Sequence, residues 1–161
     1  MDGGKLQLGP LRYGHIEAAL VEVLGIKPSA RPAFRARIRH LRNLGLPELR
    51  APGRGFHLEY TRRQALAMLA ALQLENVGQA ASDAVDIAES MVRQAPYGQH
   101  NGLDCYVYVG VIEKGRQYTM AFGLEGVVKM MKRAPEVLLL LNLSACVRRL
   151  DPALDRALVA R

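Results

Sequence analysis

Four arginines in one short segment have the spacing of an anion-binding helix face. They are Arg31, Arg35, Arg39 and Arg42, at intervals of four, four and three residues. In an α-helix these intervals bring side chains to one face, so four guanidinium groups are expected along one side of a helix. The planar guanidinium donates paired hydrogen bonds to phosphate and to the O6 and N7 atoms of guanine. This segment therefore favours recognition of a polyanion.

The positive charge of the chain is concentrated around these arginines. The 161 residues carry a net charge of +7. The window 27–63 holds ten basic residues, nine of them arginine, and two acidic ones, a net +8; the remainder holds twelve basic and thirteen acidic residues, a net −1. A charge excess confined to one window favours a nucleic acid as partner. A solvated basic face without a partner is the alternative.

Residues that could support catalysis or bind a metal are scattered. The four histidines lie far apart, and Cys105 and Cys146 are 41 positions apart without a second Cys or His at metal-binding spacing. Asp83 and Asp86 have the spacing of a helix surface, and no nucleophile elbow, phosphate-binding loop or dinucleotide fingerprint occurs. We therefore predict no enzyme, no cofactor and no metal site.

The composition is that of a folded, soluble protein. Half of the residues are apolar and 23% are charged, which argues against wholesale disorder. Apolar runs such as 137–141 are far shorter than the roughly 20 residues that span a bilayer. The first residues do not resemble a signal peptide. We expect a cytoplasmic protein with reduced thiols and no membrane partner.

The elements that must position the arginines form the first half of the chain. Apolar residues recur at helical spacing in four segments, glycines follow three of them, and Thr61 with Gln64 forms a capping box. A short glycine-led strand with alternating apolar residues has the pattern of a β-wing. The predicted helices span 12–24, about 29 or 32 to 43, 61 to about 76 and 80–93, and the wing strand spans 56–60.

The second half has a different pattern, in the order β-β-α-β-α. A linker at 94–102 precedes strands at 105–112 and 117–122, a helix at 124–133, an apolar strand at 136–143 and a last helix that starts at Ser144 or Asp151. Alternation suggests that one face of the hairpin gathers five side chains as a dimer interface, a plain core or a ligand pocket. These are Tyr106, Tyr108, Tyr118, Met120 and Phe122. We predict two domains, 12–93 and 103–161.

The first half resembles a winged helix-turn-helix, and more closely the MerR-type family of bacterial DNA-binding domains. The likeness covers residues 12–93. It rests on the helix end and glycine of 18–26, the arginine-rich helix end and Leu-Gly-Leu-Pro of 40–47, the wing with its closing tyrosine at 52–60, and the capped helix of 61–78. The resemblance implies an α+β protein in which a winged helix-turn-helix precedes the small β-β-α-β-α module.

The resemblance also implies roles for individual residues. The second helix would enter the major groove, with Arg35 and Arg39 reaching base edges. The other arginines of that helix would bind phosphates, and Arg54 at the wing tip would reach phosphate or the minor groove. A helix N-terminus adds phosphate affinity at the capped helix. The further predicted DNA contacts are Arg31, Arg37, Arg42, Asn43, Arg62 and Arg63.

The function that these patterns predict is a sequence-specific, double-stranded DNA-binding transcriptional regulator. Its predicted partners are DNA, a second copy of the chain bound through the C-terminal module, and RNA polymerase, and its predicted place is the bacterial nucleoid. One alternative is a non-regulatory DNA-binding factor, excisionase-like or nucleoid-architectural. Another is a protein-interaction or ligand-sensing adaptor whose basic face binds an acidic protein.

Overall fold

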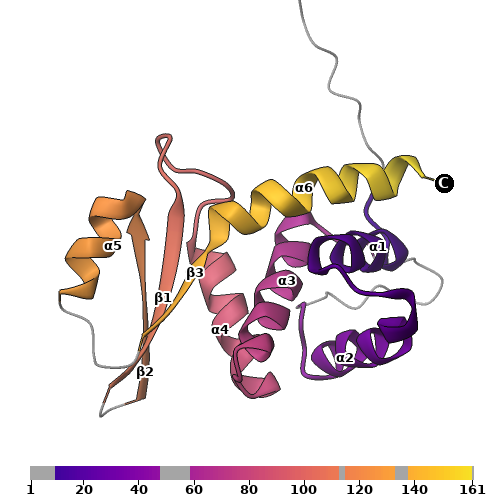
Figure 1. Ribbon diagram of the computed structural model, residues 1–161, viewed down its shortest axis with the longest axis horizontal. Coiled ribbons are helices and arrows are strands. Elements are labelled where there is room, and N and C mark those ends of the chain that lie inside the picture. Colours follow the sequence, from indigo (N-terminus) through magenta and orange to yellow (C-terminus); the bar gives the residue numbers. More distant parts are fainter. Residues whose placement is uncertain (1–9, 48–58, 113–114, 133–137, 161) are drawn as a thin grey trace, which may run out of the picture.

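The chain folds as a helical half followed by a small sheet with two helices (Figure 1). The computed structural model describes residues 10–47, 59–112, 115–132 and 138–160, with the side chains of 108–119 and of residue 138 left aside. The first half consists of α1 (Tyr13–Leu24), the 3₁₀ turn η1 (Pro28–Ala30), α2 (Arg31–Asn43), α3 (Arg62–Asn76) and α4 (Ala81–Gln94). The predicted α+β class is confirmed, and so are these four helices.

The second half has the predicted β-β-α-β-α order. It consists of β1 (Cys105–Ile112), β2 (Gly115–Phe122), α5 (Gly123–Met131), β3 (Leu138–Asn142) and α6 (Leu143–Val159). The three strands form an antiparallel sheet in the order β2-β1-β3. Because β2 and β3 both pair with β1, α5 crosses from one edge of the sheet to the other.

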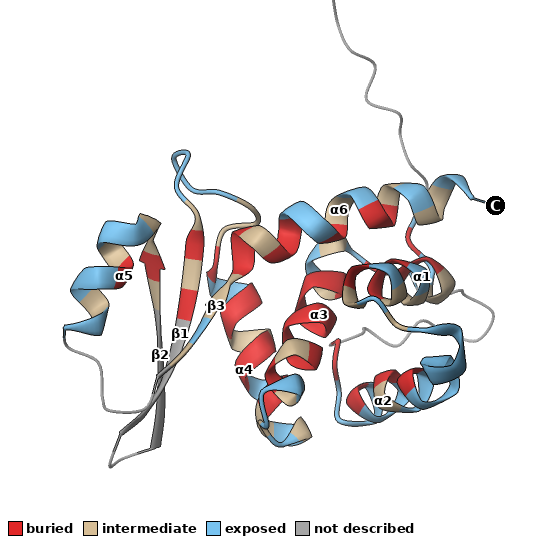
Figure 2. Cartoon of the chain, viewed as in Figure 1, coloured by how far each residue is buried: buried red, intermediate tan, exposed pale blue. Residues whose placement is uncertain are grey.

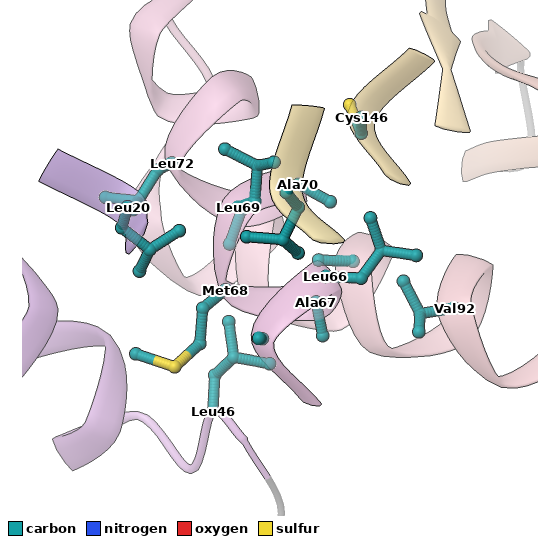
Figure 3. Close-up of a cluster of buried hydrophobic side chains, with 14 of the residues drawn as sticks. Leu20, Leu46, Leu66, Ala67, Met68, Leu69, Ala70, Leu72, Val92 and Cys146 are labelled. Carbon is teal, nitrogen blue, oxygen red and sulfur yellow. The ribbon is translucent and has the colours of Figure 1, made fainter. Parts of the chain in front are cut away.

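Helix α3 lies at the centre of the helical half and is buried on almost every side (Figure 2). Its N-terminus is closed by the predicted capping box, since Thr61 Oγ1 accepts from the Gln64 amide at 3.1 Å and Gln64 Oε1 accepts from the Thr61 amide at 2.8 Å. Figure 3 shows its apolar side chains among residues of α1, α4 and α6. The labelled side chains are Leu20, Leu46, Leu66, Ala67, Met68, Leu69, Ala70, Leu72, Val92 and Cys146.

Helix α6 runs back from the sheet across the helical half and packs against α1 and α3 (Figure 1). It is one helix that continues through Pro152, because its buried positions keep helical spacing on both sides of the proline. Those positions include Leu143, Val147, Leu150 and Leu154. They join the same apolar cluster as the core of α1 and α3. The two-domain division stays a prediction, and α6 is the element that connects its halves.

The residues before the sheet are clamped by polar side chains of α6 and β3. Asp104 receives two hydrogen bonds from Arg148, at 2.6 and 2.8 Å, and one from Asn142 at 3.2 Å. The hydrogen bonds from Arg148 are the main reason why the pKa of Asp104 lies well below its usual range. The buried Ser144 hydroxyl donates to the Gly98 carbonyl at 2.6 Å and accepts from the Cys105 amide at 2.8 Å.

The register of the hairpin corrects the predicted aromatic face. Cys105 pairs with Phe122, Tyr106 with Ala121 and Val107 with Met120. Directly paired residues share a face of an antiparallel sheet, so Tyr106 lies on the face opposite to Met120 and Phe122. The prediction assigned the alternation within each strand correctly. It was wrong in placing Tyr106 of the first strand on the same face as Met120 and Phe122 of the second. The side chains of Tyr108 and Tyr118 lie outside the described part.

The two faces of the sheet have different neighbours. Met120 and Phe122 pack against the main apolar core. Helix α5 lies over the other face, where a Cβ at Gly126 would come within 3.5 Å of the Ala121 Cβ. Its one buried side chain is Val127. Among the described residues, no helix combines the length and hydropathy that a membrane-crossing segment needs.

Candidate nucleic-acid interface

Helix α2 is held against the helical core by one apolar stripe. Phe34, Ile38 and Leu41 are 0–3% exposed, while the residues around the rest of the helix are exposed or half-buried. The helix starts after η1 with Pro32 near its N-terminus, where a missing amide hydrogen costs no hydrogen bond. It ends before Gly45, whose φ of 101° suits glycine. The backbone of α2 is therefore fixed while its outer surface is open.

The four spaced arginines lie along the side of α2 that faces α1. With 3.6 residues per turn, their Cα positions fall within an arc of about 80°. All four are exposed, as predicted. Two of them contact α1: Arg35 Nε lies 2.6 Å from Glu17 Oε1, and the Arg42 guanidinium lies 5.2 Å from the centre of the Tyr13 ring. We call Arg31, Arg35, Arg39 and Arg42 the arginine stripe.

The contacts of the arginine stripe differ from one member to the next. The Arg35 side chain is 58% exposed but bound to a Glu17 side chain that is only 14% exposed, and this hydrogen bond raises the pKa of Arg35. Within the described part of the chain, Arg31 and Arg39 form no ion pair. A charged ligand would find these two guanidinium groups available.

A groove of about 650 Å³ separates α1 from the first turns of α2. Two acids, Glu17 and Glu22, and two members of the stripe, Arg31 and Arg35, line it. Because charges of both signs meet there, the groove by itself has no preference for an anion. Arg39 and Arg42, further along the stripe, do not line this groove.

The outermost surface of α2, opposite its buried stripe, carries small and polar side chains. Ala33, Ala36, His40 and Asn43 are all exposed on it. Alanine lets the helix backbone approach a ligand surface closely, and Asn43 presents both a donor and an acceptor. Asn43 and Arg39 thus border a surface on which the backbone of α2 is open to close approach, which the amphipathic spacing alone did not indicate.

Arg37 lies on the other side of α2, away from the stripe. Its Nη2 atom lies 3.0 Å from Glu75 Oε2 and 3.1 Å from Asn76 Oδ1, at the C-terminal end of α3. The Arg37 side chain is 39% exposed. The contacts attach α2 to α3, so this arginine has a structural role whatever else it binds.

Arg62 and Arg63, at the start of α3, also donate within the chain. Arg62 forms ion pairs with Asp155 and with Asp151, the latter at 3.0 Å, and so connects α3 to α6. Arg63 donates to the carbonyl of Val92 and, at 2.9 Å, to that of Ala95, where α4 ends.

A half-buried tyrosine completes the Arg62 cluster. The Tyr97 hydroxyl donates to Asp151 Oδ1 at 2.6 Å. Burial, followed by this hydrogen bond to a carboxylate, raises the pKa of Tyr97. Asp151 is therefore held by two donors from different segments.

The remaining predicted residues contribute less to the site. Arg54 and most of the predicted wing lie outside the described residues; Tyr60, which closes it, donates its amide to the Leu11 carbonyl at 2.8 Å. Across the described residues, no three His, Cys, Asp or Glu side chains gather as a metal site would need. Burial raises the pKa of the Cys105 and Cys146 thiols. No protein-family model and no curated protein sequence matches the chain.

Proposed function

We propose that the chain is a sequence-specific, double-stranded DNA-binding transcriptional regulator that acts as a homodimer. The observation that carries this proposal is the arginine stripe, a row of exposed guanidinium groups on a helix whose backbone is anchored by Phe34, Ile38 and Leu41. A fixed backbone matters because base readout requires that side chains reach the groove in a defined register. A flexible basic segment would bind phosphates without this selectivity.

The dimensions and chemistry of α2 fit the major groove. An α-helix with its side chains is about 10–12 Å wide, and the major groove is about 12 Å wide. With Ala36 facing the floor of the groove, Arg39 reaches guanine O6 and N7 and Asn43 reaches adenine N6 and N7. Arg31 and Arg42, toward the two ends of the stripe, bind phosphates of the DNA backbone that faces this side of α2.

Arg35 enters the complex differently from Arg39. Its Nε atom is already bound to Glu17, so contact with DNA replaces one charged partner by another. The net gain from Arg35 is therefore smaller than that from Arg39, although both lie on the stripe.

The test is binding of the full chain to duplex DNA as a function of salt. A site enriched from random duplexes is compared with a scrambled duplex by fluorescence anisotropy between about 50 and 200 mM salt. Arg39→Ala is expected to cost about 1–3 kcal/mol on the enriched site and to reduce the preference over the scrambled duplex. Arg31→Ala is expected to weaken both duplexes alike and to lower the slope of log K against log salt by about 0.9.

Arg93→Ala is the matched control, because Arg93 is an exposed cation in the last turn of α4 and belongs neither to α2 nor to α5. It should leave both affinities unchanged. The proposal would be refuted if binding did not depend on salt. It would also be refuted if the Arg39→Ala protein kept the wild-type preference for the enriched duplex over the scrambled one. Equal loss on every duplex from each stripe variant would favour a non-specific DNA-binding factor instead.

A further inference from the structure

Helix α5 carries an apolar stripe that no other described part of the chain covers. Leu124, Val128 and Met131 are 73%, 51% and 55% exposed. Their intervals of four and three residues place them on one side of the helix, as in the seam of a coiled coil. On the adjoining side only Val127 is buried against the sheet. Leu124, Val128 and Met131 are thus left facing outward.

Charged residues flank this stripe in a self-complementary order. Glu125 and Lys132 lie on the same flank, one at the N-terminal and the other at the C-terminal end of α5. Glu125 also binds Lys129 of its own helix, with Nζ 2.9 Å from Oε1. When two copies of such a helix pack antiparallel about a two-fold axis, each acid meets the base of the other copy. In a parallel arrangement Glu125 of one copy and Lys132 of the other would lie at opposite ends of the seam and could not pair.

We propose that α5 is the surface through which a second copy of this chain docks, antiparallel and two-fold. Val128 lies near the axis and contacts its own counterpart, Leu124 packs against Met131 of the other copy, and Glu125 faces Lys132 of the other copy. An isologous contact of this kind repeats each interaction twice. The inference rests on the proposed function in one respect, which is that helix-turn-helix proteins bind two half-sites as two-fold dimers.

The position of α5 suits this role. It lies at the far end of the molecule from α2 (Figure 1), so docking through α5 leaves the arginine stripe of both copies uncovered. Leu140 of β3, 38% exposed, lies on the sheet face that α5 packs against and adds to the apolar surface. A stripe of this size is below the about 800 Å² per partner of a standard interface, so the dimer is expected to be micromolar.

The test is sedimentation velocity of the full chain without DNA, from roughly 1 to 200 µM. The wild type should shift from monomer to dimer across this range. Val128→Glu places two acids at the axis and should weaken the dimer about 100-fold or more. Val159→Glu is the matched control, since Val159 is 73% exposed at the opposite end of the molecule, and it should dimerise as the wild type does.

The charge order is tested by exchange. Glu125→Lys alone should weaken the dimer about 2- to 30-fold, and Glu125→Lys with Lys132→Glu should restore it, because the double variant rebuilds both pairs. Far-UV circular dichroism of each variant confirms that the monomer is folded. Restoration by the double variant excludes a merely local effect on α5.

Three outcomes would overturn the inference: a wild type that stays monomeric, a Val128→Glu variant that dimerises normally, or a double variant no better than the single one. These outcomes are independent of DNA binding. A monomer that still binds an enriched half-site would refute docking through α5 and leave the proposed DNA binding standing. A dimer that binds no DNA would refute the proposed DNA binding and leave docking through α5 standing.

Discussion

Replacement of Arg62 by alanine separates the two roles that this residue has been assigned. Its place at the N-terminus of α3 predicts a phosphate contact, whereas the structure gives its guanidinium two carboxylate partners, Asp151 and Asp155. If the intramolecular pairs are its main role, Arg62→Ala should lower the free energy of unfolding and leave DNA binding nearly unchanged. If it binds phosphate instead, Arg62→Ala should weaken DNA binding and leave the free energy of unfolding nearly unchanged.

The expected magnitude follows from the exposure of the cluster. Hydrogen bonds to charged groups contribute about 1.5–3 kcal/mol when they are buried, and exposed ion pairs contribute about 0.2–1 kcal/mol. The side chains of Arg62 and Asp151 are 33% and 32% exposed, and that of Asp155 is 49% exposed. Allowing for solvent screening, we expect Arg62→Ala to cost about 1–2 kcal/mol.

The assays are urea unfolding and the salt dependence of DNA binding, with Arg39→Ala as the paired variant. Arg39→Ala should change the free energy of unfolding by no more than about 0.5 kcal/mol. Its salt slope should still differ from that of the wild type wherever Arg39 touches a phosphate. An Arg62→Ala protein with unchanged stability and a salt slope reduced by about 0.9 would refute the structural assignment.

Three further predictions follow from the core and from two ion pairs. Leu69→Ala, at a side chain 1% exposed in the central helix, should destabilise the protein by about 2–5 kcal/mol in urea unfolding, and a smaller cost would mean that the site collapses around the cavity. Asp104→Asn should destabilise the protein at pH 7. Because the folded pKa of Asp104 is lowered, its contribution is fully present above about pH 3.9 and decreases as pH falls from there toward the folded value, so the difference in urea midpoint should be smaller at pH 3 than at pH 7, and an equal difference at both pH values would contradict this. Glu17→Gln should tighten binding to any duplex, since it releases Arg35 and removes a negative charge beside the stripe, and weaker binding would show that Glu17 positions Arg35 for contact.

Local patterns predicted most helices within one or two residues, because their ends depend on nearby residues. Gly25 adopts a φ of 64° at the end of α1, and Thr61 caps α3, each within one turn of the helix it ends or begins. The start of the last helix was not determined by the sequence, since both Ser144 and Asp151 have side chains that can cap a helix. The structure starts it at Leu143, with the Asn142 side chain accepting from the Ala145 amide at 2.8 Å.

Contacts between distant segments were not predictable in the same way. The packing of α6 on α1 joins residues more than a hundred positions apart, and one amphipathic stripe does not identify which other stripe covers it. The hairpin shows the same restriction on a smaller scale. Alternation placed Tyr106 and Phe122 correctly within their own strands, but the register decides whether the two share a face, and the register depends on the turn.

The basic window provides the clearest case, because charges outside it alter its meaning. Three of its arginines form ion pairs with acids that lie elsewhere in the chain: Arg35 with Glu17, Arg37 with Glu75, and Arg62 with Asp151 and Asp155. The charge count along the sequence assigns these acids to the residues outside the window. In the folded protein they lie next to its arginines and neutralise part of its charge.

Among the described residues of the window, the free positive surface is therefore smaller than a net charge of +8 suggests, and it is centred on Arg31, Arg39 and Arg42. The two phosphate contacts proposed for Arg31 and Arg42 correspond to a salt slope of only about −1.8 for one copy, and two copies on adjacent half-sites would double it. A slope near the larger value on a two-half-site duplex, reduced to the smaller one by Val128→Glu, would connect the arginine stripe of α2 to the apolar stripe of α5. A single copy bound with the larger slope would instead mean that residues beyond this surface reach the DNA.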